Sequence, residues 1–173
     1  MKLTPILHIL SILIMPLSGF MIISGLVDLV YNDENWINFF SSAIITFFVG
    51  MSVFLATTGN EDQNIDLRQA FVLTTMSWIT IAFFGALPFY LSDINLNFTN
   101  SFFESMSGIT TTGSTILTNI ELSPPGILVW RSLLQWLGGI GVIVMAIAIF
   151  PMLSVGGMQL FKAENFETPE KVV

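Results

Sequence analysis

Cysteine is absent from the 173-residue sequence, histidine occurs once, and charged residues make up only 10% of it. Without cysteine the chain has no disulfide and no thiolate metal ligand, so the sequence gives no indication of a redox compartment. The single histidine, His8, is expected to lie at a membrane interface rather than to act as a ligand, and we expect no enzyme. The sequence has five lysines and arginines and twelve aspartates and glutamates, which gives a net charge of −7. The chain lacks a basic patch, which argues against a nucleic-acid partner.

Hydrophobic residues, in contrast, make up 53% of the sequence, and the mean hydropathy is +0.79. These values are typical of a membrane protein and not of a soluble domain. Apolar segments long enough to cross a bilayer, which takes roughly 20 residues, occur at 4–30, 37–58, 70–91 and 126–153. Lipid admits only helices or closed barrels, so the sequence predicts an all-α membrane protein with four spanning helices.

The stretch 97–125, between the third and fourth apolar segments, is too polar to span and too apolar for an ordinary exterior loop. Residues 101–107 are predicted to form a short helix, because Ser101 followed by Glu104 has the form of a capping box. Such a helix is too short to cross the bilayer. Backbone that ends at membrane depth must be buried in protein or line a water-filled cavity. We therefore predict a re-entrant pore helix.

Residues 108–115, which follow this helix, combine three consecutive threonines with a glycine. The C-terminus of a helix carries partial negative charge, and backbone carbonyls can replace the hydration shell of a potassium-like ion. Gly113 permits the turn that aims successive carbonyls at one axis. We expect extended or left-handed backbone at 110–113, with the carbonyls of Thr111 and Thr112 turned away from the third span and without protein donors; the alternative is a threonine-rich exterior loop. The predicted selectivity filter comprises Thr110, Thr111, Thr112, Gly113, Ser114 and Thr115.

Glu104 and Arg131 are the only strongly charged residues that the sequence places well inside the apolar architecture. Ionisable residues in a membrane are costly and are usually paired, so we expect these two side chains to hold the pore helix to the fourth span. The alternative for Arg131 is snorkelling to the outer interface. The fourth span also contains three glycines, Gly138, Gly139 and Gly141. Small residues let membrane helices approach closely, so we expect these glycines to pack against the pore helix; the alternative is that they form a gating hinge.

The placement of lysine and arginine predicts the orientation of the spans. Four spans put the N-terminus, the loop 59–69 and the C-terminal tail on one side of the membrane. The loops on the other side contain acids but no basic residue. The first side is therefore expected to be cytoplasmic, with the filter facing outward; its basic residues are Lys2, Arg68, Lys162 and Lys171.

Two blocks of the sequence, 102–115 and 130–161, resemble the first pore segment and the following helix of TrkH-type potassium uptake proteins, in the Trk/Ktr/HKT superfamily. The resemblance implies four helix–pore loop–helix repeats around a pseudo-fourfold pore, preceded by two extra helices. It implies two N-terminal transmembrane helices with a cytoplasmic loop at 1–69 and the first repeat at 70–155. Residues 156–173 would form a cytoplasmic tail that begins a truncated remainder.

The resemblance further implies potassium uptake across the bacterial cytoplasmic membrane, with oxygens of Thr111 and Thr112 coordinating the transported ion and no other cofactor. The implied partners are the lipid bilayer, the remaining repeats, a second full-length copy in a homodimer, and a cytoplasmic nucleotide-binding regulatory subunit. One filter segment supplies about a quarter of an ion-coordinating ring, so a fragment or truncated subunit is expected; the alternative is assembly of four copies into a homotetramer. The alternative function is a non-conducting structural or regulatory membrane subunit.

Overall fold

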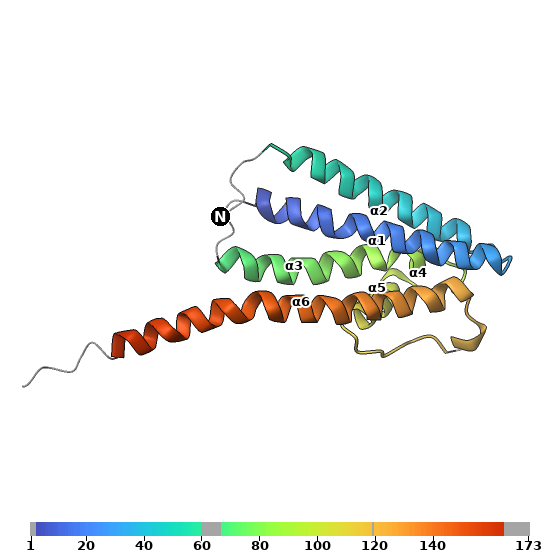
Figure 1. The fold of residues 1–173 in the computed structure, drawn as a ribbon. Helices are drawn as coiled ribbons and strands as arrows, with labels where there is room; N and C mark the ends of the chain where they lie inside the picture. Colours follow the sequence, from blue (N-terminus) through green and yellow to red (C-terminus); the bar gives the residue numbers. More distant parts are fainter. Residues whose placement is uncertain (1–2, 60–66, 119, 165–173) are drawn as a thin grey trace, which may run out of the picture. The chain divides into compact units, whose positions relative to one another are not determined.

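The computed structural model of the chain describes residues 3–59, 67–118 and 120–164, with the backbone alone for Leu67 and for residues 145–164. Within these residues the regular elements are six α-helices and one short 3₁₀ turn, Ile120–Leu122 (Figure 1). The chain divides into two units, Met1–Gly138 and Gly139–Val173. The first unit holds α1 to α5 and the beginning of α6, and with them almost all of the predicted site.

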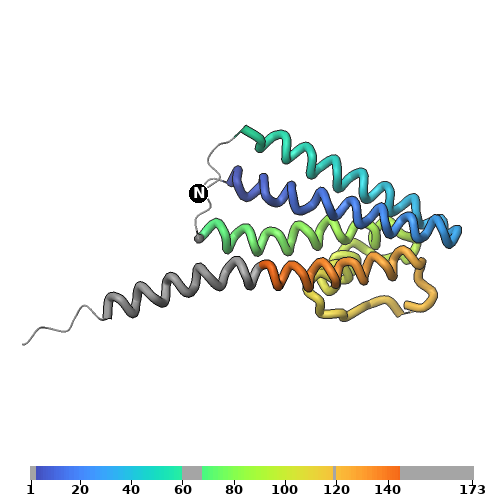
Figure 2. The backbone as a smooth tube through the Cα atoms, in the orientation of Figure 1, coloured from blue at the N-terminus to red at the C-terminus, as the bar shows by residue number. Residues whose placement is uncertain are grey.

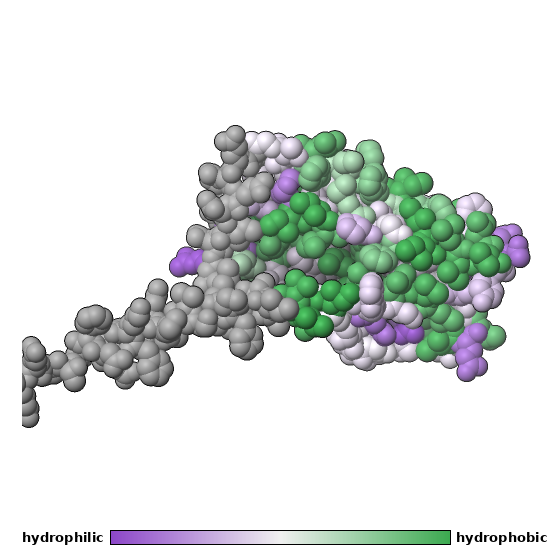
Figure 3. All heavy atoms as spheres, in the orientation of Figure 1, coloured by the Kyte–Doolittle hydropathy of each residue, from purple (hydrophilic) through white to green (hydrophobic). Residues whose placement is uncertain are grey.

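Four apolar helical stretches are long enough to cross a membrane, which confirms the prediction of four spans. They are α1 (Thr4–Val30), α2 (Trp36–Thr57), the stretch Arg68–Leu91 and the first part of α6, Pro125–Val144, with mean hydropathies of 2.3, 2.1, 1.8 and 1.6. Hydrophobic side chains cover much of the described surface on the face seen in Figure 3. The described part of the chain contains no β-strand, as expected for a chain in lipid.

The third span is not one continuous helix, in contrast to the prediction for 70–91. It is divided into α3 (Leu67–Gly85) and α4 (Leu87–Leu91). Pro88 causes the break, because proline has no N–H to donate and its ring clashes with the carbonyl one turn earlier. The Trp130 indole Nε1 donates to the Gly85 carbonyl at 3.0 Å and satisfies a backbone acceptor at the break.

The pore helix is α5 (Phe98–Ile109), which begins earlier and ends later than the predicted 101–107. Its N-cap is Asn97, whose side chain accepts a hydrogen bond from the Asn100 N–H at 2.8 Å. The predicted capping box is therefore wrong: the Ser101 hydroxyl donates to the Asn97 carbonyl at 3.0 Å instead. Twelve helical residues extend about 18 Å, so α5 is too short to span the bilayer.

A buried core joins the first two spans to the helices around α5. Trp130 at the start of α6 is fully buried and packs edge-on against Phe39 of α2, with ring centroids 6.3 Å apart. Met21 of α1, Phe89 of α4 and Ile109 of α5 belong to the same cluster. The N-terminal helices and the pore segment are thus packed around one apolar centre.

The helix α6 (Pro125–Glu164) continues past the predicted end of the fourth span at residue 153. The prediction took the end of the apolar composition as the end of the helix. A helix depends on its backbone hydrogen bonds and can continue after its side chains cease to suit lipid. The predicted tail at 156–173 is accordingly helical as far as Glu164, and its last nine residues lie outside the described part.

Candidate selectivity filter

The loop that leads from α5 towards α6 (Figure 2) begins with the predicted filter. The N–H groups of Thr110, Thr111, Thr112 and Gly113 all donate back to carbonyls of α5, at distances of 2.9–3.3 Å. Among the described residues, no hydrogen-bond donor is found for the carbonyl oxygens of these four residues, all of which are exposed. The loop therefore uses its donors on its own helix and leaves its acceptors available.

The backbone of this loop turns at two left-handed residues. Thr111 has φ +58° and Gly113 has φ +75°, which confirms the left-handed conformation expected there. Thr110 differs from the expectation, since its φ of −79° and ψ of 2° are neither extended nor left-handed. A β-branched residue with positive φ is an outlier, and strain of this kind clusters at functional sites. Thr111 is therefore a strained residue at the centre of the candidate site.

The threonine hydroxyls of the loop form a short chain. Thr110 Oγ1 donates to the Met106 carbonyl at 2.8 Å and lies 2.9 Å from Thr112 Oγ1. Because the single proton of Thr110 is used on Met106, the Thr112 hydroxyl is the donor in the second contact. The side chains of both threonines are thus oriented by α5, and neither carries a charge.

Glu104 of α5 lies at the back of the filter and holds the chain that leaves it. Its Oε2 accepts from Arg131 Nε at 3.1 Å, and its Oε1 accepts from the Ile116 N–H at 2.7 Å and from the Thr115 hydroxyl. The carboxylate side chain is fully enclosed, and the Arg131 side chain is 15% exposed. The structure thus brings Glu104 and Arg131 together, and Arg131 pairs rather than snorkels.

Of the three glycines predicted to pack against the pore helix, the structure places only Gly138 at α5. A Cβ at Gly138 would collide with the carbonyl of Ile109, the last residue of α5. Gly108 in turn faces Leu134, whose Cβ would lie 3.0 Å from an added Cβ. A Cβ at Gly139 or Gly141 would meet no described atom within 4 Å.

Asp28 is a buried charge that the sequence analysis missed, so the expectation that only Glu104 and Arg131 are buried was wrong. It lies in the last turn of α1, is fully buried, and accepts hydrogen bonds from Asn35 Nδ2 at 2.9 Å and from the Gly126 N–H. Gly126 is in the first turn of α6, where N–H groups lack helical partners and favour an anion. The available signal was an acid inside an apolar segment, which requires a partner.

His8 joins the beginning of α1 to the end of α2. Its Nδ1 lies 2.9 Å from Thr57 Oγ1, and its ring stacks on Phe54 with centroids 5.0 Å apart. Among the described residues no cluster of three or more histidine, cysteine or acidic side chains could hold a metal ion. The oxygens suited to a cation are instead the neutral ones of the filter loop at the C-terminus of α5.

Comparisons with known proteins identify the family of the chain. A family model described as TrkH, cation transport protein, matches residues 36–171. The Trk system potassium uptake protein TrkI of Halomonas elongata is 44% identical over 98% of this chain and 34% of its own length. TrkH of Escherichia coli K12 is 42% identical over 92% of the chain and 33% of its own length.

The chain thus spans about a third of the length of the curated relatives that it matches. The crystal structure of the potassium transporter TrkH from Vibrio parahaemolyticus superposes with a TM-score of 0.83 at 31% identity, over 96% of this chain and 36% of that one. The family model covers more than three quarters of the chain, and the solved structure has the same all-helical membrane fold. The chain therefore belongs to the TrkH family of cation transport proteins.

Proposed function

We propose that this chain forms the first part of the channel-like membrane subunit of a Trk-type potassium uptake system, a transporter rather than an enzyme. The observation that carries the proposal is the loop after α5, in which the carbonyls of residues 110–113 have no donor among the described residues. These carbonyls follow the C-terminus of a half-helix, which favours a cation, and potassium is the ion that rings of backbone carbonyls coordinate. The potassium uptake proteins among its relatives support the choice of ion.

In this proposal the carbonyls of Thr111 and Thr112 coordinate the transported potassium ion, and Thr110 and Gly113 complete the segment. Ser114 and Thr115 form its outgoing end. The single loop supplies about a quarter of the ring, and the remaining repeats of a full-length protein supply the rest. A homodimer of full-length subunits and a cytoplasmic nucleotide-binding regulator complete the assembly that the family resemblance implies.

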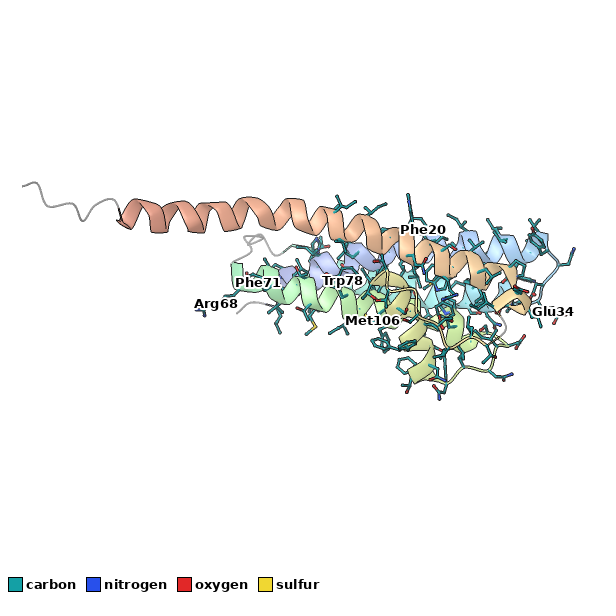
Figure 4. All side chains as sticks on the ribbon, turned by 90° about the horizontal axis from the view of Figure 1, so that it is seen from below. Phe20, Glu34, Arg68, Phe71, Trp78 and Met106 are labelled. Atoms are coloured by element: carbon teal, nitrogen blue, oxygen red, sulfur yellow. The ribbon has the colours of Figure 1, made fainter. Side chains whose placement is uncertain are left out.

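We place the chain in a bacterial cytoplasmic membrane with its N-terminus in the cytoplasm. Arg68 and Glu34 lie at opposite ends of the first unit, as Figure 4 shows. Basic residues favour the cytoplasmic side of a membrane protein, so the end at Arg68 is cytoplasmic and the end at Glu34 is outside. The filter then faces outward, where acidic loops attract cations.

The test is potassium uptake by the full-length protein with Gly113→Ala or Gly113→Ser, compared with rubidium and sodium uptake. Gly113 has φ +75°, a conformation that costs an L-residue roughly 1–2 kcal/mol. We expect a reduced potassium uptake and a reduced preference for potassium over sodium. The control is Gly19→Ala, because a Cβ at this exposed position of α1 meets no described atom within 4 Å. Unchanged flux and selectivity in the Gly113 variants would contradict the filter assignment.

A further inference from the structure

We propose that Glu104 is a positioning residue for ion selectivity, acting through Thr115 on the backbone of the filter. This inference rests on the proposed function of residues 110–113 as the filter. Glu104 touches no transported ion in this arrangement. Its carboxylate holds the outgoing chain at Thr115 and Ile116, and that chain in turn fixes the spacing of the carbonyls before it.

The filter loop is tied to α5 through its N–H groups at residues 110–113 and through Ser114, Thr115 and Ile116 where the chain leaves it. At its beginning, the N–H groups of residues 110–113 are tied to α5. At its end, the Ser107 hydroxyl donates to the Ser114 carbonyl at 2.6 Å, and Glu104 accepts from Thr115 and Ile116. The carbonyls of residues 110–113 have no donor among the described residues, so no hydrogen bond fixes them directly. Their positions therefore depend on the N–H bonds of these residues and on the bonds that Ser107 and Glu104 make just after them.

The chemistry of the outgoing anchor requires a carboxylate. An ionised carboxylate only accepts hydrogen bonds, and here three donors converge on it: the Thr115 hydroxyl, the Ile116 N–H and Arg131 Nε. A glutamine at 104 would direct an NH₂ group at one of these donors. Hydrogen bonds to a charged group are stronger than those between neutral groups, so a mismatch at this enclosed site would displace the chain that it holds.

Thr115 is the part of this anchor that can be changed most cleanly. Its Oγ1 donates to Glu104 and accepts from the Leu117 N–H at 3.1 Å. Thr115→Val keeps the shape of the side chain but removes both bonds, and Thr115→Ser keeps the hydroxyl. Thr118→Val is the matched control in the same loop, because the Thr118 side chain is exposed.

The experiment measures potassium and sodium uptake by the full-length protein with each of these variants and with Glu104→Gln, normalised to the amount of protein in the membrane. For Thr115→Val we expect the potassium-to-sodium ratio to fall by on the order of fivefold, with Thr115→Ser within about twofold of the unmodified protein. A positioning role changes this ratio. A merely structural role lowers the amount of protein or both normalised fluxes together, and leaves the ratio unchanged.

Two results would overturn the proposal. One is a Thr115→Val ratio equal to that of Thr118→Val, and the other is a proportional loss of both fluxes with Thr115→Val. If Gly113→Ala still changes selectivity in the same assay, only the role of Glu104 fails. If Gly113→Ala leaves selectivity unchanged as well, the filter assignment fails with it. Should Glu104→Gln not reach the membrane, the threonine variants decide the question alone.

Discussion

At the scale of single residues, Asp28 joins segments of the chain that lie far apart in the sequence. Its carboxylate accepts from the N–H of Gly126, 98 residues later, and from Asn35 Nδ2. A Cβ at Gly126 would collide with this carboxylate, so glycine is required for the approach. Because the group is fully buried, its removal leaves enclosed donors without an acceptor, which costs about 1–3 kcal/mol for each donor.

We therefore expect Asp28→Ala to destabilise the chain by about 2–4 kcal/mol, the sum of two such losses reduced by relaxation of the site. The measurement is thermal unfolding of the chain in detergent micelles. Asp93→Ala is the matched control, since Asp93 is exposed and its side chain makes no hydrogen bond or ion pair with the described residues. An equal, small change in both variants would show that Asp28 does not connect α1 to α6.

Residue-scale contacts were also the least predictable from the sequence. Asp28 lies inside the predicted first span and therefore requires a partner, but the partner Gly126 is distant in sequence and no local pattern points to it. The contacts of Glu104 were only partly predictable. Its pairing with Arg131 follows from the rule that buried charges are paired. Its second set of bonds, to Thr115 and Ile116, depends on how the loop folds back. No periodicity encodes that return.

At the scale of elements, the contact between α5 and α6 depends on Gly138. A Cβ there would collide with the carbonyl of Ile109, at the end of α5 from which the filter loop starts. We expect Gly138→Ala to destabilise the chain by about 1–3 kcal/mol, the usual cost of overpacking, because both partners of the collision are backbone. Thermal unfolding in micelles measures this loss, with Gly19→Ala as the control for adding a methyl group to an apolar helix.

A Gly138→Ala variant as stable as the Gly19→Ala variant would mean that α5 and α6 tolerate a wider separation.

The boundaries of these elements show why sequence patterns locate helices better than they locate helix ends. The capping-box pattern of Ser101 and Glu104 was present, but Asn97 is a strong N-cap residue and forms the cap instead. Pro88 stands within the predicted third span, yet whether proline bends or divides a helix depends on its neighbours. Trp130 is the neighbour that satisfies the Gly85 carbonyl.

At the scale of the whole molecule, the four spans could be predicted because hydropathy is a local property of the sequence and lipid requires about 20 apolar residues for each crossing. The start of α2 at Trp36 and the whole extent of α1 at 4–30 agree with the prediction to within one residue. How the spans pack around Trp130 could not be predicted, because a mean hydropathy of 2.1 or 2.3 leaves no polar face to mark the buried side.

The orientation of the spans gives the last prediction, and the absence of cysteine from the sequence makes it directly testable. Single substitutions Glu34→Cys, Thr58→Cys and Glu121→Cys introduce a thiol at exposed positions in an otherwise thiol-free chain. In sealed right-side-out vesicles, we expect a membrane-impermeant thiol reagent to label positions 34 and 121. Position 58 should react only after the membrane is permeabilised, because basic residues keep its end of the spans in the cytoplasm. The reverse labelling pattern would place the filter mouth on the cytoplasmic side of the membrane and would contradict the proposed orientation.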